Sequence, residues 1–252
     1  MRLRTLMLVI ISGLLIAPAA ARAMPLRTAR VAAPAGAVAA DAGVRAQHAP
    51  RPAPVFTLVD ATSGIVVRWR AGGGMAGRLA GRTPLGTPTW LWALSESRDG
   101  RWARVVLPWK PNGRTGWVSL RGRRTVHTRT WVQADLSRRR VMLMRSGAVR
   151  RSFVAAIGAP GSPTPIGRFS VTDPIATGDP SGPFGWYAFG LSGHQPNLPA
   201  GWSGGDQLAI HGTNDPASLG RAASAGCLRV SAGALAVLKR ALQPGTPVVI
   251  HP

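Results

Sequence analysis

Cys227 and His211 are the two residues of this sequence best suited to chemistry. Cys227 is the only cysteine, and His211 ends an apolar run, residues 208–210, that is typical of a short buried strand. A thiol reacts as its thiolate, and a free thiol with a pKa near ~8.5 is mostly protonated at neutral pH, so an imidazole is its usual activator. Gly212 and Gly226 stand beside these residues, where the backbone must approach a substrate closely. If the loop between them folds back, the pattern predicts a Cys–His acyl-transfer site.

Such a reaction gives each residue a role. The Cys227 thiolate attacks a carbonyl, and His211 takes the thiol proton and later delivers one to the leaving amine. The backbone N–H groups of Gly226 and Cys227 are the candidates to hold the negative oxygen of the tetrahedral intermediate. An imidazole base also needs an orienting partner. Asp206 and Asp215 flank the histidine in the sequence, and neither has an obvious claim to that role.

These residues and their surroundings resemble the L,D-transpeptidase catalytic domain, also called the YkuD domain. The resemblance rests on the apolar strand ending in His211-Gly-Thr, on the string Ser-x-Gly-Cys-x-Arg from Ser224, and on Thr-Pro-x-Gly-x-Phe within residues 158–169. It covers about residues 130 to 252. It implies a cysteine acyltransferase that joins peptidoglycan stem peptides into cross-links through a Cys227 thioester, with no cofactor and no metal.

The resemblance also implies roles for neighbours of the pair. The carbonyl of Gly212 is expected to hold the His211 ring. Ser224 is expected to support the loop or to contact the substrate through its hydroxyl. Arg229 is expected either to pair with a substrate carboxylate or to brace the loop.

Three further residues are expected to contact the substrate. Trp186 and Tyr187 lie in a segment that shapes the donor pocket in the family, and Tyr187 is a candidate hydrogen-bond donor near the acyl oxygen. Ala225 stands where the family usually has histidine. Its backbone amide is retained, but any role of the histidine side chain is lost, and His194 is a candidate substitute for it.

Charge and leader together indicate where the protein acts. The formal net charge is +22, and nearly all of the basic residues are arginine. Such a charge favours polyanions: nucleic acid, acidic membrane surfaces or an anionic cell wall. Arg2 and Arg4, the apolar residues 6–16 and the string Ala21-Arg-Ala predict a cleaved secretory signal over residues 1–23, with an uncleaved anchor as the alternative.

Export narrows the choice of partners. We expect the protein in the periplasm or cell wall, with no membrane span after signal cleavage, so that the anionic wall is the expected partner and nucleic acid is not. A single cysteine allows no internal disulfide, and an unpaired thiol in an exported chain favours a functional sulfur.

The rest of the sequence predicts a mainly β protein with two domains. Residues 24–54, rich in Ala, Pro and Arg, read as a disordered linker, and residues 55–124 as short strands of a small SH3-like barrel. Residues 128–252 are expected to form a β-sandwich-type catalytic domain. Its predicted features are a three-strand meander over 130–157, a loop region over 173–206 that covers the site, and a helix capped by Ser231.

Two alternatives to a transpeptidase stay open at this point. In an L,D-carboxypeptidase, water would resolve the thioester. In a non-catalytic peptidoglycan-binding protein, the SH3-like module would bind the wall, and Ala225 is the feature that favours this alternative.

Overall fold

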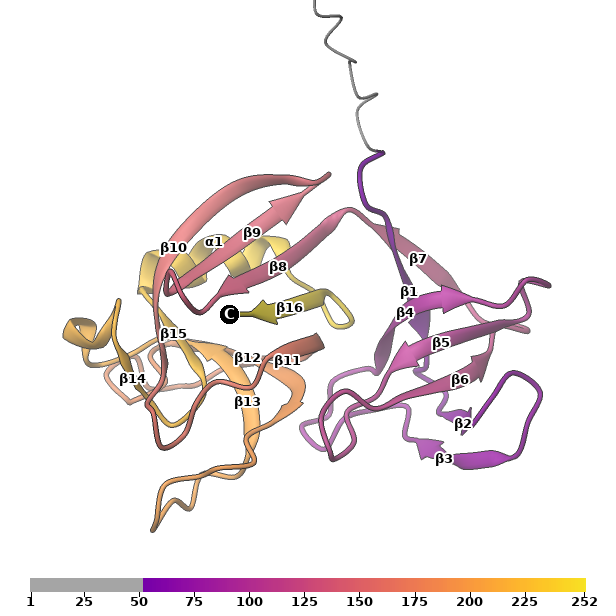
Figure 1. Ribbon diagram of the computed structural model, residues 1–252, viewed down its shortest axis with the longest axis horizontal. Helices are drawn as coiled ribbons and strands as arrows, with labels where there is room; N and C mark the ends of the chain where they lie inside the picture. The colour runs from indigo at the N-terminus through magenta and orange to yellow at the C-terminus, as the bar shows by residue number, and fades with distance from the viewer. Residues whose placement is uncertain (1–51) are drawn as a thin grey trace, which may run out of the picture. The chain divides into compact units, whose positions relative to one another are not determined.

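The structure is a computed structural model that describes residues 52–252. The predicted signal peptide and nearly all of the predicted linker lie outside the described residues. Within them the chain forms two β-sheets and one α-helix, so the described part is mainly β with one short helix, as predicted (Figure 1). It contains no helix that is long and apolar enough to cross a membrane.

The first sheet is antiparallel and has the strand order β3-β2-β6-β5-β4-β1-β7. Its strands alternate inward apolar residues with outward polar ones, as Ala103 and Val105 of β5 show. The pairings leave β3 and β7 as edges, and the SH3-like barrel stays a prediction. The strands are β1 (Phe56–Asp60), β2 (Ile65–Arg68), β3 (Met75–Leu79), β4 (Trp90–Glu96), β5 (Trp102–Val106), β6 (Thr115–Ser119) and β7 (Thr125–Thr128).

The second sheet has the order β14-β10-β15-β13-β12-β11-β16-β8-β9, and β10 also pairs with β9. That extra pairing closes eight strands into a ring, so the predicted sandwich is wrong. The strands are β8 (Thr130–Asp135), β9 (Arg140–Arg145), β10 (Ala148–Gly158), β11 (Gly167–Ala176), β12 (Tyr187–His194), β13 (Gln207–His211), β14 (Ala222–Ser224), β15 (Leu228–Val230) and β16 (Pro247–His251).

The ring closes because β10 is long enough to pair with both ends of the sheet. It has 11 residues and a register shift between Val149 and Arg151. Its first part pairs with β9, and Ala155 and Ala156 then pair with β15. The meander β8-β9-β10 is confirmed, whereas the short strands on either side of Cys227 were not predicted.

The helix α1 (Ala232–Ala241) begins where the sequence predicts. The side chain of Ser231 caps it by accepting a hydrogen bond from the Ala234 N–H at 3.2 Å. Its buried face contributes Leu235 and Leu238 to the core of the second sheet, where burying one leucine stabilises the fold by about 1.5–3 kcal/mol. A single 3-10 turn, η1 (Pro216–Ser218), interrupts the loop between β13 and β14.

Candidate active site

The sheet brings the predicted base and nucleophile to one face. β13 and β15 are parallel neighbours, with Ile210 opposite Leu228 and His211 opposite Arg229. Ile210 and Leu228 are buried in the core, so alternation places His211 and Arg229 on the other face. Cys227 directly precedes β15, two residues before Arg229, the residue that pairs with His211.

The imidazole of His211 is held as a neutral base. Its side chain is buried, and Nδ1 lies 2.6 Å from the carbonyl oxygen of Gly212, so Nδ1–H donates and Nε2 is left as the acceptor. The ring of Phe184 packs edge-on against it, with 5.0 Å between centroids. Burial lowers the pKa of His211 to about 4; the Gly212 carbonyl opposes this shift and the charge of Arg229 adds to it.

The sulfur of Cys227 rests on the backbone of β13. The residue is half-buried, and its thiol points to the carbonyl oxygen of Gln207, with Sγ and O 4.0 Å apart. Burial raises the pKa of the Cys227 thiol, while the Ala209 N–H and the charge of Arg229 act in the opposite direction. Sulfur and imidazole therefore each bond to a backbone carbonyl, and no hydrogen bond joins them in this arrangement.

Ser224 supports the loop that carries the cysteine. Its buried hydroxyl donates to the Cys227 carbonyl at 2.6 Å and accepts from the Gly226 N–H at 3.1 Å. This second bond corrects one expectation, because the N–H of Gly226 is already used and is not free for an oxyanion. Of the two predicted donors, the Cys227 N–H remains.

Gln195 is the residue of the site that sequence reasoning missed. It is only 4% exposed, and its Nε2 donates to the carbonyls of Ser162 at 3.2 Å, Pro163 at 3.0 Å and Ala225 at 3.3 Å. A Cβ on Gly226, whose φ is +119°, would overlap this same nitrogen. A lone glutamine in a Gly- and Pro-rich stretch carries no local signal for such a role.

Trp186 and Tyr187 pack with the core of the second sheet. Ala188 pairs with His211 and shares its face, so alternation turns the Tyr187 side chain to the opposite side of the sheet. Tyr187 is buried in the core, and Lys239 of α1 lies 4.7 Å from the centroid of its ring and 5.2 Å from that of Trp186. Burial raises the pKa of the Tyr187 hydroxyl. This placement gives no support to Tyr187 as a donor to an acyl oxygen.

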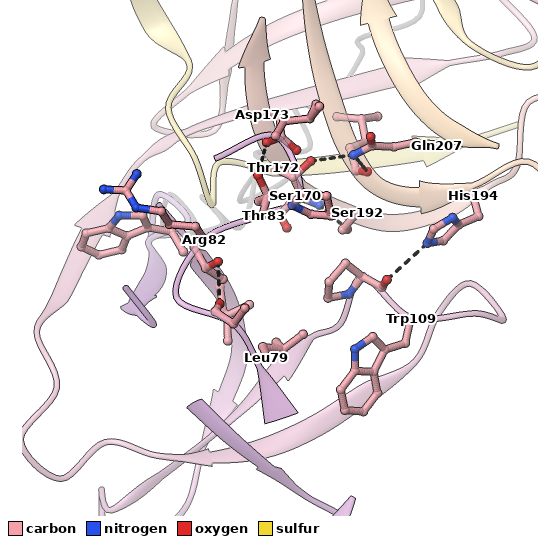
Figure 2. A pocket seen from close by; sticks show the side chains of 18 residues that line it. Leu79, Arg82, Thr83, Trp109, Ser170, Thr172, Asp173, Ser192, His194 and Gln207 are labelled. Carbon is pink, nitrogen blue, oxygen red and sulfur yellow. Dashed lines mark hydrogen bonds between the residues drawn. The ribbon is translucent and has the colours of Figure 1, made fainter. Parts of the chain in front are cut away.

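The contacts of Asp206, Asp215 and His194 bear on two expectations: an acidic partner for His211, and His194 as a substitute for the family histidine. Asp206 does not orient His211, since it pairs with Lys110 and with His194. His194 cannot replace a catalytic histidine because both of its ring nitrogens are engaged. Its Nδ1 lies 3.1 Å from the Asp206 carboxylate. Its Nε2 lies 3.2 Å from the Pro108 carbonyl (Figure 2). Asp215 uses its backbone to cap η1 and makes no side-chain bond to His211.

Arg229 has an unsatisfied donor on the face shared by His211 and Cys227. The residue is half-buried, and its Nε is buried without a hydrogen-bond partner among the described residues. A buried donor without a hydrogen bond costs folding free energy. No hydrogen bond therefore offsets the burial of this Nε within the described residues.

Two cavities lie beside the site rather than over the sulfur. The one in Figure 2, of about 320 Å³, is lined by both sheets, and there Thr83 hydrogen-bonds to Asp173 and Gln207 to Thr172. A second cavity, of about 720 Å³, is lined in part by Gln195, which also bonds to the Ala225 carbonyl in the loop that carries the cysteine. In the described part of the chain no cluster of three or more His, Cys, Asp or Glu side chains could hold a metal ion.

The part of the chain that forms the second sheet is similar in sequence to known proteins. Residues 129–250 match the family YkuD, the L,D-transpeptidase catalytic domain. The chain is 29% identical over 120 residues to YkuD of Bacillus subtilis (strain 168), and 30% identical over 121 residues to YkuD of Bacillus licheniformis. Both matches cover 48% of this chain and 65% of the relative's length. Residues 129–250 are thus similar in sequence to the YkuD L,D-transpeptidase catalytic domain, and the chain spans 65% of the length of these two relatives.

Solved structures of L,D-transpeptidases are also similar. One from Mycobacterium smegmatis is 16% identical, with 81% of this chain and 88% of that chain covered and a TM-score of 0.40. Another, from Mycobacterium tuberculosis H37Rv, is 17% identical, with 57% and 74% covered and a TM-score of 0.41.

Proposed function

We propose that this protein is a peptidoglycan L,D-transpeptidase that works through a thioester on Cys227. The observation that supports the proposal is the pairing of β13 with β15, which brings the strand that ends in His211 beside the strand that follows Cys227. The match of residues 129–250 to the catalytic domain supplies the reaction class.

The first half-reaction begins with a rotation of the Cys227 side chain away from Gln207 and toward Nε2 of His211. His211 takes the thiol proton as sulfur attacks the carbonyl, so the S–C bond forms without a preformed thiolate. This sequence suits the two pKa shifts, since burial keeps the thiol protonated and the imidazole neutral before substrate arrives. The Cys227 N–H holds the oxyanion.

The first half-reaction ends when His211 delivers its proton to the departing amine as the C–N bond breaks, which leaves the acyl group on sulfur. The second half-reaction restores the enzyme. A second amine then attacks the thioester, His211 takes its proton, and the thiol is reformed. With water in place of the amine, the same steps give an L,D-carboxypeptidase.

Arg229 gives the site a preference for carboxylates. Arg229 stands opposite His211 in the pairing of β13 with β15, and charge-assisted bonds from a guanidinium to a carboxylate are about twice as strong as neutral ones. Stem peptides carry such groups, and the net charge of +22 favours an anionic wall. The leader-like residues 1–23 support action outside the cytoplasmic membrane.

Mass spectrometry separates the three candidate functions. After exposure to imipenem, we expect one acyl adduct on Cys227 in the wild type and none in Cys227→Ala. Incubation of stem tetrapeptides with and without an amine acceptor then distinguishes cross-linking from hydrolysis. Absence of both adduct and product, together with retained wall binding, would instead favour the non-catalytic binder that Ala225 suggests.

A further inference from the structure

Gln195 ties together the two segments that border the nucleophile. Its side-chain amide donates to Ser162 and Pro163, in the loop between β10 and β11, and to Ala225, two residues before Cys227. Its Oε1 accepts from the Asn197 N–H at 2.9 Å. With both ends of the amide bonded and the side chain buried, the main chain leading to Cys227 has one preferred position.

Gln195 is itself held through the residue before it. The side chain of Asn112, in the turn between β5 and β6 of the first sheet, accepts from the His194 N–H at 2.8 Å and donates to the His194 carbonyl at 2.6 Å. This is the pattern that a neighbouring strand would make, and it fixes the backbone at His194 in both directions.

The same turn of the first sheet holds the other end of the loop. Gln195 N–H donates to the Asp206 carbonyl at 2.7 Å, which closes the loop 195–206. The Asp206 carboxylate pairs with Lys110 and with the His194 ring. The other nitrogen of that ring bonds to the Pro108 carbonyl (Figure 2). Pro108, Lys110 and Asn112 thus all bond to the segment that carries Gln195.

We infer that Gln195 is a positioning residue for Cys227 and that the turn 108–112 of the first sheet keeps Gln195 in place. The first sheet then acts in the acyl-transfer reaction as well as in any wall binding. The inference rests on the proposed function for its catalytic readout. For the position of the sulfur, the inference rests only on the hydrogen bonds of Gln195 and Asn112 and does not need the proposed function.

Gln195→Glu is the sharpest test because it preserves shape. The carboxylate keeps an acceptor for Asn197 but faces three carbonyl oxygens where a donor stood. A displacement of the nucleophile by about 1 Å can cost 10²-fold in rate, so we expect the maximal rate of Cys227 acylation by imipenem to fall on the order of 10²-fold. Gln243→Glu, on an exposed side chain two residues after the end of α1, adds the same charge as a control.

Asn112→Ala tests the link from the first sheet. It removes both bonds to His194 while leaving every residue near the sulfur intact, and we expect a loss on the order of 10-fold in the same rate. Asn112→Asp keeps the acceptor to the His194 N–H and is expected to lose less. If Gln195→Glu does not fold, the comparison of Asn112→Asp with Asn112→Ala still tests the positioning role.

Three readouts distinguish positioning from a purely structural role. They are the maximal acylation rate against the half-saturating imipenem concentration, the pH profile of Cys227 alkylation by iodoacetamide, and the melting temperature. A fall in the maximal rate at little-changed half-saturation, measured well below the melting temperature, supports the inference. Wild-type rates in folded Gln195→Glu, or in Asn112→Ala when Gln195→Glu does not fold, overturn it.

Failure of the proposed function gives a different result. In that case the wild type forms no adduct and no cross-links, and the alkylation profile alone decides. A shift of that profile to higher pH in Gln195→Glu but not in Gln243→Glu supports the positioning role. Coincident profiles overturn it.

Discussion

The Nδ1 of His211 lies 2.6 Å from the carbonyl oxygen of Gly212, the next residue in the chain. A backbone carbonyl therefore does here what a carboxylate does in many Cys–His or Ser–His sites: it fixes the tautomer and aims Nε2. Unlike a carboxylate, it carries no full charge to stabilise an imidazolium. The histidine consequently stays neutral, with its pKa lowered to about 4 mainly by burial.

This buried neutral histidine makes stability depend on pH. The unfolded chain binds the proton first, near pH 6.5, so the contribution of His211 is complete above that pH and is lost as the pH falls from 6.5 toward 4. The loss amounts to about 3 kcal/mol of unfolding free energy. Urea unfolding across this range should show a shallower pH dependence in His211→Gln. The exposed His127→Gln serves as the control, and equal slopes in both variants would contradict the prediction.

Gly226→Ala should disturb the cysteine loop. The backbone has φ of +119°, and the new Cβ would overlap Nε2 of Gln195. Strain and overlap together should lower the free energy of unfolding by about 2–4 kcal/mol and slow acylation of Cys227. Gly161→Ala, where no heavy atom lies within 4 Å of the Cβ, should change stability by no more than about 0.5 kcal/mol. Similar losses in both variants would argue against a special role for Gly226.

Arg229→Gln should raise the pKa of both Cys227 and His211. The charge of Arg229 lowers the pKa of Cys227 and of His211, so its removal raises both. Alkylation of Cys227 should then require higher pH, and the imidazole resonances of His211 should titrate at higher pH in NMR spectra. Arg221→Gln, at an exposed arginine directly before β14, matches the change in net charge. If the pH profile of alkylation is the same in Arg229→Gln as in the wild type, the charge of Arg229 does not act on the Cys227 thiol.

Tyr187→Phe should leave the reaction nearly unchanged. The hydroxyl belongs to a side chain on the core face of β12, under Lys239, and not on the face of His211. We expect acylation by imipenem within about 2-fold of the wild-type rate, since a lost oxyanion donor typically costs 10²–10³-fold. A loss of that larger size would show that the tyrosine acts on the acyl oxygen after all.

Local patterns in the sequence predicted the parts of the site that lie within one segment. The apolar run before His211 indicated β13, Ser231 indicated the start of α1, and the motif around Cys227 indicated the nucleophile. The meander over β8, β9 and β10 follows from short apolar runs separated by turns. These features depend on alternation, capping and turn chemistry, which neighbouring residues determine.

Other features depended on register and on partners far away in the chain. A register shift of one residue exchanges the two faces of a strand, so only the pairing of Ala188 with His211 decided that Tyr187 faces the core. Likewise, Asn112 meets His194 across 82 residues, and Gln195 meets Ala225 across 30. The sequence by itself indicated which residues could react and where most of the strands lie, but not the short strands β14 and β15 on either side of Cys227. Only the tertiary structure decided which donors hold the nucleophile, because long-range hydrogen bonds leave no periodic pattern in the chain.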